Sequence, residues 1–270
     1  MSRKLFLFLL LTMLTVGGGI YITSGQAISL VNTVDPDDTA FVDGVPASSI
    51  AYLDGRRFGF TCGVDTITDA DDNVYDTIQI GEQCWTVQSM RVGTRIDGSE
   101  TPSDNGIIEK YCYGDNEDNC TDDHPNEPDG ALYTWNEAMQ YSTTEGAQGI
   151  CPDGWHIPTH DEFTILERAL CTSGTCETDF PFDTTTTSFR GTDEGTQLKP
   201  NGTSSLEWNL AGYRSTDGSF FDRGSNGVFW SSSESSGSDA WFRSVNSGEA
   251  GVNRVAATKA VGLSVRCLKD

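Results

Sequence analysis

The sequence is poor in basic residues. It has 17 Lys and Arg against 40 Asp and Glu, which gives a formal net charge of −23 at pH 7. Nucleic-acid binding depends on neutralising phosphates with Lys and Arg, and attraction to an anionic membrane surface also needs basic residues. We therefore expect neither nucleic acid nor an anionic lipid surface to be a partner. Such acidity keeps an exported domain soluble and attracts basic partners or divalent cations.

Familiar catalytic motifs are also missing. The chain has neither the G-x-S-x-G turn of serine hydrolases nor the H-E-x-x-H helix of zinc peptidases. His156 and His160 are four residues apart, but Pro158 and a helix cap lie between them, so they cannot share one helical face. We interpret both as structural, with His156 hydrogen-bonded to a backbone carbonyl. The sequence thus predicts a protein that is not an enzyme and needs no catalytic cofactor.

The main apolar run of the chain lies at its N-terminus. Two basic residues precede Leu5–Val16, which is the layout of a signal peptide, and the small residues Gly25 and Ala27 predict cleavage after residue 27. No cysteine follows this run, so we do not expect a lipoprotein anchor. The alternative is an uncleaved anchor, because Leu5–Ile22 approaches the roughly 20 residues of a membrane span. Residues 1–27 are expected to place the remainder outside the cytoplasm in either case.

Cysteine usage agrees with export. The eight cysteines are Cys62, Cys84, Cys112, Cys120, Cys151, Cys171, Cys176 and Cys267. An even number in an exported chain favours disulfides, which persist in oxidising compartments, whereas structural zinc sites show paired C-x-x-C-like spacings. Only Cys171 and Cys176 approach such a spacing. Short separation favours Cys112–Cys120 and Cys171–Cys176 as local bridges, and the sequence pattern leaves the other pairings open.

Composition divides the chain into a polar segment and a domain. Residues 28–60 are polar with short apolar runs, and we interpret them as a linker or an accessory strand. Residues 61–270 contain all six tryptophans and are long enough to bury a core of their own.

Two short helices are predicted from their N-terminal caps. Thr159 and Glu162 form a capping box before an apolar stripe, which predicts a helix over 160–170. Thr134 and Glu137 form a second box of the same kind.

The other patterns indicate strands. Val74–Ile80 carries β-formers with Gln79 on the polar face, as in a half-buried strand. At the C-terminus, apolar residues alternate over 241–245, 252–256 and 263–267, which predicts an antiparallel meander. Short helices followed by strands favour an α+β fold with antiparallel sheets.

Asp69, Asp71 and Asn73 match the first oxygen ligands of a calcium loop. An EF-hand loop starting there would need glycine where Val74 stands and glutamate where Ile80 stands. A turn stabilised by Asp and Asn side chains is the favoured interpretation, with a structural calcium site of another geometry as the alternative.

The ordered motifs of the domain resemble a known family. They are YDTIQIGEQCW (75–85), LYTW (132–135), CPDGWHIPT (151–159), AGYR (211–214), FWSSSE (229–234) and GLSVRC (262–267). The region from Cys62 to the C-terminus is similar to the Fibrobacter succinogenes major paralogous domain family. Departures are an enlarged acidic stretch at 115–129 and an insertion around Thr184–Thr187.

The resemblance implies an exported domain of bacterial surface proteins without an established activity. It also implies a fold similar to C-type-lectin-like and formylglycine-generating-enzyme domains. In that architecture Cys151 would pair with Cys267, and Cys62 with Cys84. With every cysteine in a pair, none would remain for the thiol chemistry of formylglycine-generating enzymes.

We therefore expect a secreted or cell-surface recognition or adhesion module whose ligand is a glycan or a protein. Most tryptophans are expected in the core, with Trp208 and Trp230 as candidates for ligand contact and the loops around Asp217–Ser236 as the candidate binding surface. The alternative is a structural component of a cell-envelope assembly, anchored through an uncleaved N-terminal segment.

Overall fold

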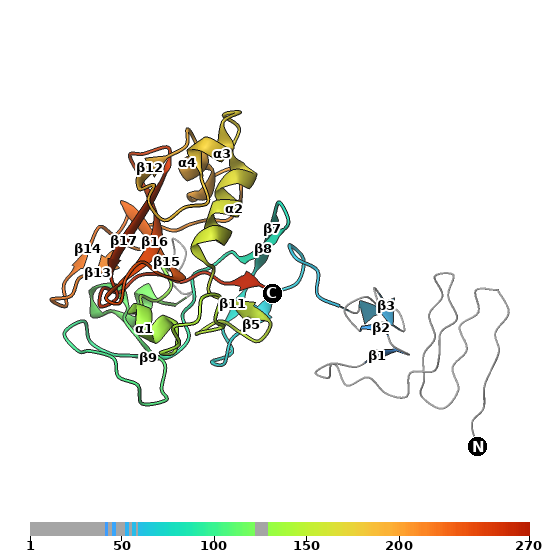
Figure 1. Ribbon diagram of the computed structural model, residues 1–270. Helices are drawn as coiled ribbons and strands as arrows, with labels where there is room; N and C mark the ends of the chain where they lie inside the picture. Colours follow the sequence, from blue (N-terminus) through green and yellow to red (C-terminus); the bar gives the residue numbers. More distant parts are fainter. Residues whose placement is uncertain (1–40, 43–44, 47–51, 54–55, 58, 122–128) are drawn as a thin grey trace, which may run out of the picture. The chain divides into compact units, whose positions relative to one another are not determined.

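A computed structural model describes residues 41–42, 45–46, 52–53, 56–57, 59–121 and 129–270 of the chain (Figure 1). Internal contacts divide the chain into two units, Met1–Thr61 and Cys62–Asp270. The expected leader, residues 1–27, lies outside the described residues. Within the described residues, no helix has both the length and the apolar character of a membrane span.

Two short antiparallel strand pairs are described in the first unit. β1 (Phe41–Val42) pairs with β2 (Val45–Pro46), and β3 (Tyr52–Leu53) pairs with β4 (Arg56–Arg57). They fall in the segment interpreted from sequence as a linker or an accessory strand.

The second unit is an α+β domain with several antiparallel sheets. Its strands are β5 (Ile67–Thr68), β6 (Val74–Tyr75), β7 (Thr77–Ile80), β8 (Gln83–Thr86), β9 (Thr94–Arg95), β10 (Glu109–Lys110), β11 (Trp155–His156), β12 (Ser188–Arg190), β13 (Tyr213–Arg214), β14 (Phe220–Phe221), β15 (Asn226–Glu234), β16 (Asp239–Asn246), β17 (Val252–Thr258) and β18 (Leu268–Lys269). Its helices are α1 (Trp135–Ala138), α2 (His160–Leu170), α3 (Cys176–Asp179) and α4 (Glu194–Leu198), with the 3₁₀ turns η2 (Tyr113–Asp115) and η3 (Glu117–Asn119).

A small sheet has the strand order β11-β18-β8-β7. Its β7–β8 hairpin turns at Gly81, whose φ of 58° is in the left-handed region that glycine adopts without strain. The predicted strand Val74–Ile80 is divided between β6 and β7. Within β7, Gln79 is exposed and Ile80 is buried, as the sequence pattern predicts.

A larger sheet has the order β12-β17-β16-β15, and every neighbouring pair is antiparallel. The pairing of β16 with β17 confirms two strands of the predicted C-terminal meander. The third strand was predicted wrongly, because β12 takes the place beside β17. Residues 263–267 instead make isolated bridges and lead to β18 in the small sheet. All five of these residues are buried, so their apolar side chains do not mark one buried face of a strand.

Helix α2 confirms the prediction from its cap. Thr159 Oγ1 accepts from the Glu162 amide at 3.1 Å, and the Glu162 carboxylate accepts from the Thr159 amide at 2.8 Å. The helix ends at Leu170, before Cys171, and lies against one side of the large sheet (Figure 1). Its apolar face belongs to the main core cluster, which comprises Ile80, Trp85, Phe163, Leu166, Leu198, Leu206, Trp208, Phe229, Val245, Val252 and Leu268.

Helix α1 confirms half of its predicted capping box. Thr134 Oγ1 accepts from the Glu137 amide at 3.4 Å. The Glu137 carboxylate does not return to the cap, because it accepts from the Glu109 amide at 2.9 Å and from the Tyr141 hydroxyl at 3.0 Å. Helices α3 and α4 were not predicted, and neither has the side-chain cap that would have identified it.

The four disulfides have the expected pairing. They join Cys62 to Cys84, Cys112 to Cys120, Cys151 to Cys267 and Cys171 to Cys176. All eight cysteines are thereby paired. The Cys151–Cys267 bridge spans 116 residues of sequence and ties the segment before β11 to the segment before β18.

Candidate binding site

A groove of about 390 Å³ lies on the face of the large sheet that points away from α2. Its polar lining consists of Asn226, Ser244, Asn246 and Asn253. Its apolar lining consists of Phe189, Tyr213, Phe242, Val261 and Leu263, with the smaller side chains of Val228 and Ala257. Its volume falls within the range of about 300–1,000 Å³ typical of ligand pockets, and its aromatic walls beside a few polar side chains make it the candidate site.

Strand alternation explains why these side chains share one face. Successive side chains of a strand point to opposite sides of the sheet. In β16, Val245 belongs to the core cluster beneath α2, whereas Phe242 and Ser244 line the groove. Antiparallel register then places Val228 of β15 and Asn253 of β17 on either side of Ser244.

The register also gives the groove two different ends. Asn226 pairs with Asn246, and the next row contains Ser244 and Asn253, so the amide groups gather at one end. Further along, Phe242 and Ala257 belong to rows without an amide and form the apolar end. A ligand with both polar and apolar faces suits such a surface.

Hydrogen bonds orient the amides at the polar end. Asn246 Nδ2 donates to Asn226 Oδ1 at 2.6 Å, and Asn226 Nδ2 donates to the Asp222 carboxylate at 2.7 Å. Asn253 Nδ2 donates to Ser244 Oγ at 3.3 Å, and no donor among the described residues reaches the Asn253 side-chain oxygen. That oxygen and the second N–H of each amide therefore remain available to a ligand.

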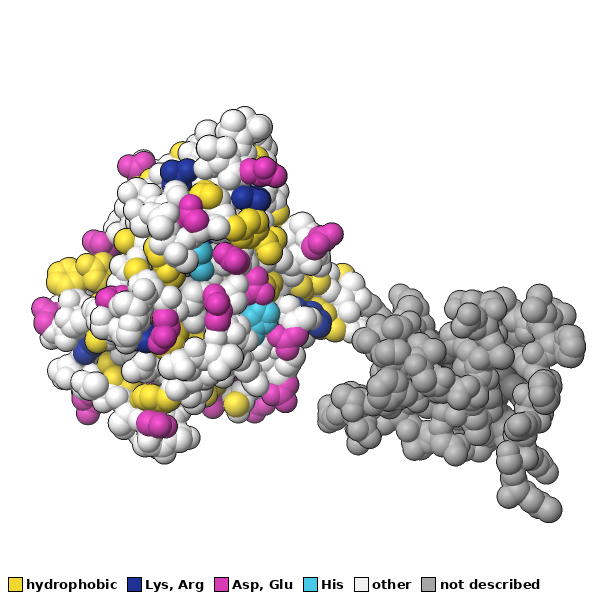
Figure 2. All heavy atoms as spheres, viewed as in Figure 1, with side chains coloured by type: hydrophobic (Ala, Val, Ile, Leu, Met, Phe, Trp, Pro, Cys, Tyr) yellow, Lys and Arg dark blue, Asp and Glu magenta, His cyan; other side chains and the backbone are white. Residues whose placement is uncertain are grey.

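Aromatic rings form the walls of the groove. Phe189 of β12 is 44% exposed. Tyr213 of β13 is half-buried and its ring centroid lies 5.8 Å from that of Phe221, and Figure 2 shows hydrophobic side chains gathered at this β13–β14 edge. Burial, with the Asp222 and Asp217 carboxylates, raises the pKa of Tyr213, so its hydroxyl stays protonated at neutral pH.

A buried polar network supports the opposite side of the sheet. Arg243 of β16 and Arg254 of β17 are fully buried, and Arg243 donates to the Glu167 carboxylate of α2. The ring nitrogens of His160 lie 3.2 Å from Arg243 Nη1 and 2.8 Å from Arg254 Nη2. Burial and the two arginines lower the pKa of His160 to about 3, so its ring is neutral and can accept a hydrogen bond. This network fixes the two central strands from the core side.

The sequence-based candidates for ligand contact need correction. Trp208 and Trp230 are both 0% exposed. Trp208 packs on Phe229 with ring centroids 4.6 Å apart, and Trp230 Nε1 donates to the Tyr133 carbonyl at 2.9 Å. Large indole surfaces are stabilised by burial, and neither ring offers a face to a ligand.

The expected binding surface around Asp217–Ser236 overlaps the groove in part. Asn226 and Val228 of that segment line it, and the β13–β14 hairpin, whose second strand lies in the segment, borders it through Tyr213. The contributions of β12, β16 and β17 were missed. A period-two pattern of Asn, Ser and Phe along β16 and β17 was the available signal, but alternation alone does not distinguish an outer groove from a wet face.

The predicted calcium ligands form an Asx turn. Asp69 Oδ1 accepts from the amides of Asp71 and Asn73 at 2.9 and 3.0 Å, and Asp69 Oδ2 accepts from the Tyr75 hydroxyl at 2.5 Å. The oxygens that a cation would need are thus directed at hydrogen-bond donors. Within the described residues, no group of three His, Cys, Asp or Glu side chains converges as a metal site would require.

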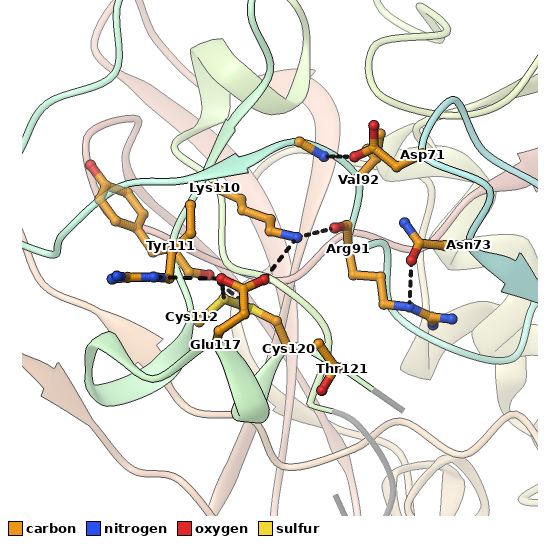
Figure 3. A network of polar contacts seen from close by, with 12 residues as sticks. Asp71, Asn73, Arg91, Val92, Lys110, Tyr111, Cys112, Glu117, Cys120 and Thr121 are labelled. Carbon is orange, nitrogen blue, oxygen red and sulfur yellow. Dashed lines mark hydrogen bonds and ion pairs between the residues drawn. A yellow bond between two sulfur atoms is a disulfide. The ribbon is translucent and has the colours of Figure 1, made fainter. Parts of the chain in front are cut away.

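Asp71 and Asn73 also join a second polar network (Figure 3). Asp71 Oδ2 accepts from the Gly93 amide at 2.6 Å, and Arg91 Nε donates to Asn73 Oδ1 at 3.1 Å. Lys110 Nζ donates to the Arg91 carbonyl at 2.6 Å and lies 3.4 Å from Glu117. These contacts tie the β5–β6 loop and the η3 turn to one backbone segment, so we interpret the network as structural.

The predicted hydrogen-bond partner of His156, a backbone carbonyl, was wrong. Its Nδ1 lies 2.7 Å from the Asp270 carboxylate, and its Nε2 lies 3.0 Å from Glu162. The backbone carbonyl partner belongs to His160 instead, whose Nε2 lies 2.8 Å from the Asp183 oxygen. Burial opposes charging of His156, but its hydrogen bonds to the two carboxylates raise its pKa above the usual value.

A disulfide-bonded α+β domain with a groove lined by uncharged side chains on one sheet face defines a class of fold rather than a particular activity. The chain belongs to the Fibrobacter succinogenes major domain family, whose family model matches residues 78–269. No curated protein and no solved structure matches the chain.

Proposed function

We propose that this domain is a non-enzymatic recognition or adhesion module that binds its ligand in the groove on the outer face of the β12-β17-β16-β15 sheet. The observation that carries the proposal is the groove itself, with oriented amides at one end and aromatic walls beside them. Binding sites combine an apolar lining with a few placed polar groups, and this groove has that composition.

The rigidity of the groove supports the same proposal. The amides are held by one another and by Asp222, and the two central strands, which carry Asn246 and Asn253, are fixed from behind by Arg243 and Arg254. Side chains already ordered before binding lose less conformational entropy when a ligand arrives.

We place the protein outside the cytoplasm, at the cell surface or secreted. The four disulfides support that location, because such bonds persist in oxidising compartments. The alternative role, a structural component of a cell-envelope assembly, depends on the apolar N-terminal run being kept as an anchor. The intact mass of the exported protein separates the two roles: loss of residues 1–27 supports a released module, and an intact leader in the membrane fraction supports the anchored component.

In fold we propose a similarity to C-type-lectin-like domains. The support is the α+β layout together with the Cys151–Cys267 bridge, which joins the segment before the Trp-His-x-Pro motif to the residue before the last strand. An experimental structure whose two sheets and helix α2 fail to superpose on such domains would reject this part of the proposal.

Binding is tested on an array that carries both glycans and peptides, with oxidised full-length chain. We expect a specific signal that falls when Phe189 is replaced by Ala. The matched control is Phe182→Ala, since Phe182 is also an exposed phenylalanine, at 49% against 44%, but stacks with Arg168 on α2. A signal that both variants keep equally would move the ligand away from the groove.

A further inference from the structure

We propose that the groove accepts an uncharged carbohydrate chain. This inference rests on the proposed function, because it names the class of ligand for the same site. The observation behind it is that no charged side chain is among the residues that line the groove. That neutrality is unusual in a chain with 40 acidic and 17 basic residues, and it indicates a ligand without formal charge.

The pairing of rings with amides fits a sugar. Phe189 is the register partner of Asn253, so a ring and an amide stand side by side on one face of the sheet. A pyranose has an apolar C–H face that packs on a ring and hydroxyl groups at its edge. Each hydroxyl both donates and accepts, and so does each amide, which matches the free Asn253 oxygen and the remaining N–H groups.

The surroundings of the groove disfavour an anionic ligand. The nearby arginines Arg243 and Arg254 point to the core side of the sheet, where they contact Glu167 and His160. At the rim, the Asp222 carboxylate contacts Asn226. An acidic sugar or a nucleotide would therefore meet negative charge at the rim and no cation in the groove.

A peptide is disfavoured by the backbone geometry. Peptides that bind sheets usually add a strand to a free edge, where backbone groups are unpaired. The groove instead lies on a sheet face, and β16 at its centre is paired on both sides by β15 and β17. Only side-chain amides and hydroxyls are offered there, which suits hydroxyl recognition better than a peptide backbone.

The test is affinity gel electrophoresis of the oxidised full-length chain. The probes are three uncharged polysaccharides, namely a soluble mixed-linkage glucan, galactomannan and arabinoxylan, with polygalacturonate as the anionic comparison. We expect at least one uncharged polymer to retard the wild-type chain, with a dissociation constant that changes less than twofold between about 50 and 500 mM NaCl, because no charge pair would be screened.

Two variants and one control locate that binding. Tyr213→Ala and Asn253→Leu are each expected to weaken retardation by about tenfold, the equivalent of one lost ring contact or hydrogen bond. Asn253→Leu keeps a similar branched side chain without a donor or acceptor and serves if Tyr213→Ala does not fold. Phe182→Ala is expected to behave like the wild-type chain.

The outcomes separate the two proposals. Retardation by polygalacturonate alone, or array binding to peptides that the groove variants abolish, would overturn the carbohydrate class while keeping the groove as the binding site. Retardation that both groove variants retain would overturn the site as well. No retardation by any polymer together with a blank array would overturn both proposals.

Discussion

Individual charged residues hold the core side of the sheet that carries the groove. Glu167 is fully buried and contacts Arg243, which is also fully buried. Removing one member of a buried ion pair leaves the other charge without a partner, which is strongly destabilising. We expect Glu167→Ala to reduce the free energy of unfolding by about 3–5 kcal/mol, measured by urea denaturation at pH 7.

The control for this prediction is Glu82→Gln, because Glu82 is exposed in the β7–β8 turn. It should change the free energy of unfolding by less than about 0.5 kcal/mol. A loss below about 1 kcal/mol for Glu167→Ala would contradict the role given to the buried network.

His156, which contacts the last residue, Asp270, makes the stability of the fold depend on pH. Hydrogen bonds to Glu162 and Asp270 raise the pKa of His156 despite its burial, and the pKa of Glu162 is lowered by its bonds to His156 and Thr159 despite burial. A raised histidine pKa stabilises the fold below the unfolded-state pKa, and this contribution is lost as pH rises through the folded-state value. The lowered Glu162 pKa stabilises the fold above the unfolded-state value and is lost in acid.

We therefore expect His156, Glu162 and Asp270 together to contribute most to the free energy of unfolding near pH 5.5. The contribution of His156 should be lost by pH 8.5. Comparison of urea midpoints at the two pH values for wild-type and His156→Gln chains measures it. The wild-type advantage should shrink at pH 8.5. An equal difference at both values would show that His156 acts by packing alone.

The sequence predicted the role of an individual residue only where local spacing alone determines that role. The Cys112–Cys120 and Cys171–Cys176 bridges and the Asx turn at Asp69 followed from local spacing, whereas the other two bridges followed from the family resemblance. Trp208 and Trp230 did not, because an indole gains more from burial than from exposure and the sequence does not show which surface covers it. Phe189 and Tyr213, two of the three rings in the groove, have no local sequence signal that marks them.

Helix α2 is the element on which the core is assembled. Its capping box satisfies two backbone amides at once, through Thr159 and Glu162. We expect Thr159→Ala to cost about 1 kcal/mol of unfolding free energy, in the range of about 0.5–2 kcal/mol found for such caps. Thr143→Ala, at an exposed position before the helix, is the control and should be neutral. Equal stability of the two variants would mean that the box is not needed once α2 is packed.

Elements were predictable where a local signal and the tertiary contacts agree. α2 has a complete box and an apolar stripe, and β16 and β17 alternate clearly. α1 kept its Thr134 cap, but its Glu137 was recruited by the distant Glu109 amide, which local sequence cannot show. Apolar residues alternate over 263–267 as in a strand with one buried face. The segment instead runs between the two sheets, with both of its sides buried.

At the scale of the whole molecule, the disulfides differ in how much chain they constrain. Cys151–Cys267 closes a loop with a sequence separation of 116, whereas Cys171–Cys176 closes one of 5. On the chain-entropy model these bonds stabilise by about 5 and about 2 kcal/mol. The double variant Cys151→Ser/Cys267→Ser should therefore lose about 2–3 kcal/mol more than Cys171→Ser/Cys176→Ser in urea denaturation. Equal losses would show that strain in the native state, not the entropy of the unfolded chain, determines how much each disulfide stabilises the fold.

The α+β class and the disulfide framework were predictable from composition, caps and family resemblance, since each has a signal along the chain. The groove was not, because it is made where β12, β13, β15, β16 and β17 meet, and strand pairing over such separations leaves no local trace.

The proposed ligand site on the outer face of the large sheet can be mapped residue by residue. Hydroxyl-radical footprinting of the oxidised full-length chain, with and without the glucan, galactomannan and arabinoxylan in turn, reads this directly as oxidation of Phe189, Tyr213 and Phe242. The rate at exposed Phe182 corrects for radicals consumed by the sugar. We expect one polymer to lower oxidation of the three groove rings several-fold relative to Phe182. An unchanged ratio of groove-ring to Phe182 oxidation with a polymer that retards the chain would show that the ligand binds elsewhere.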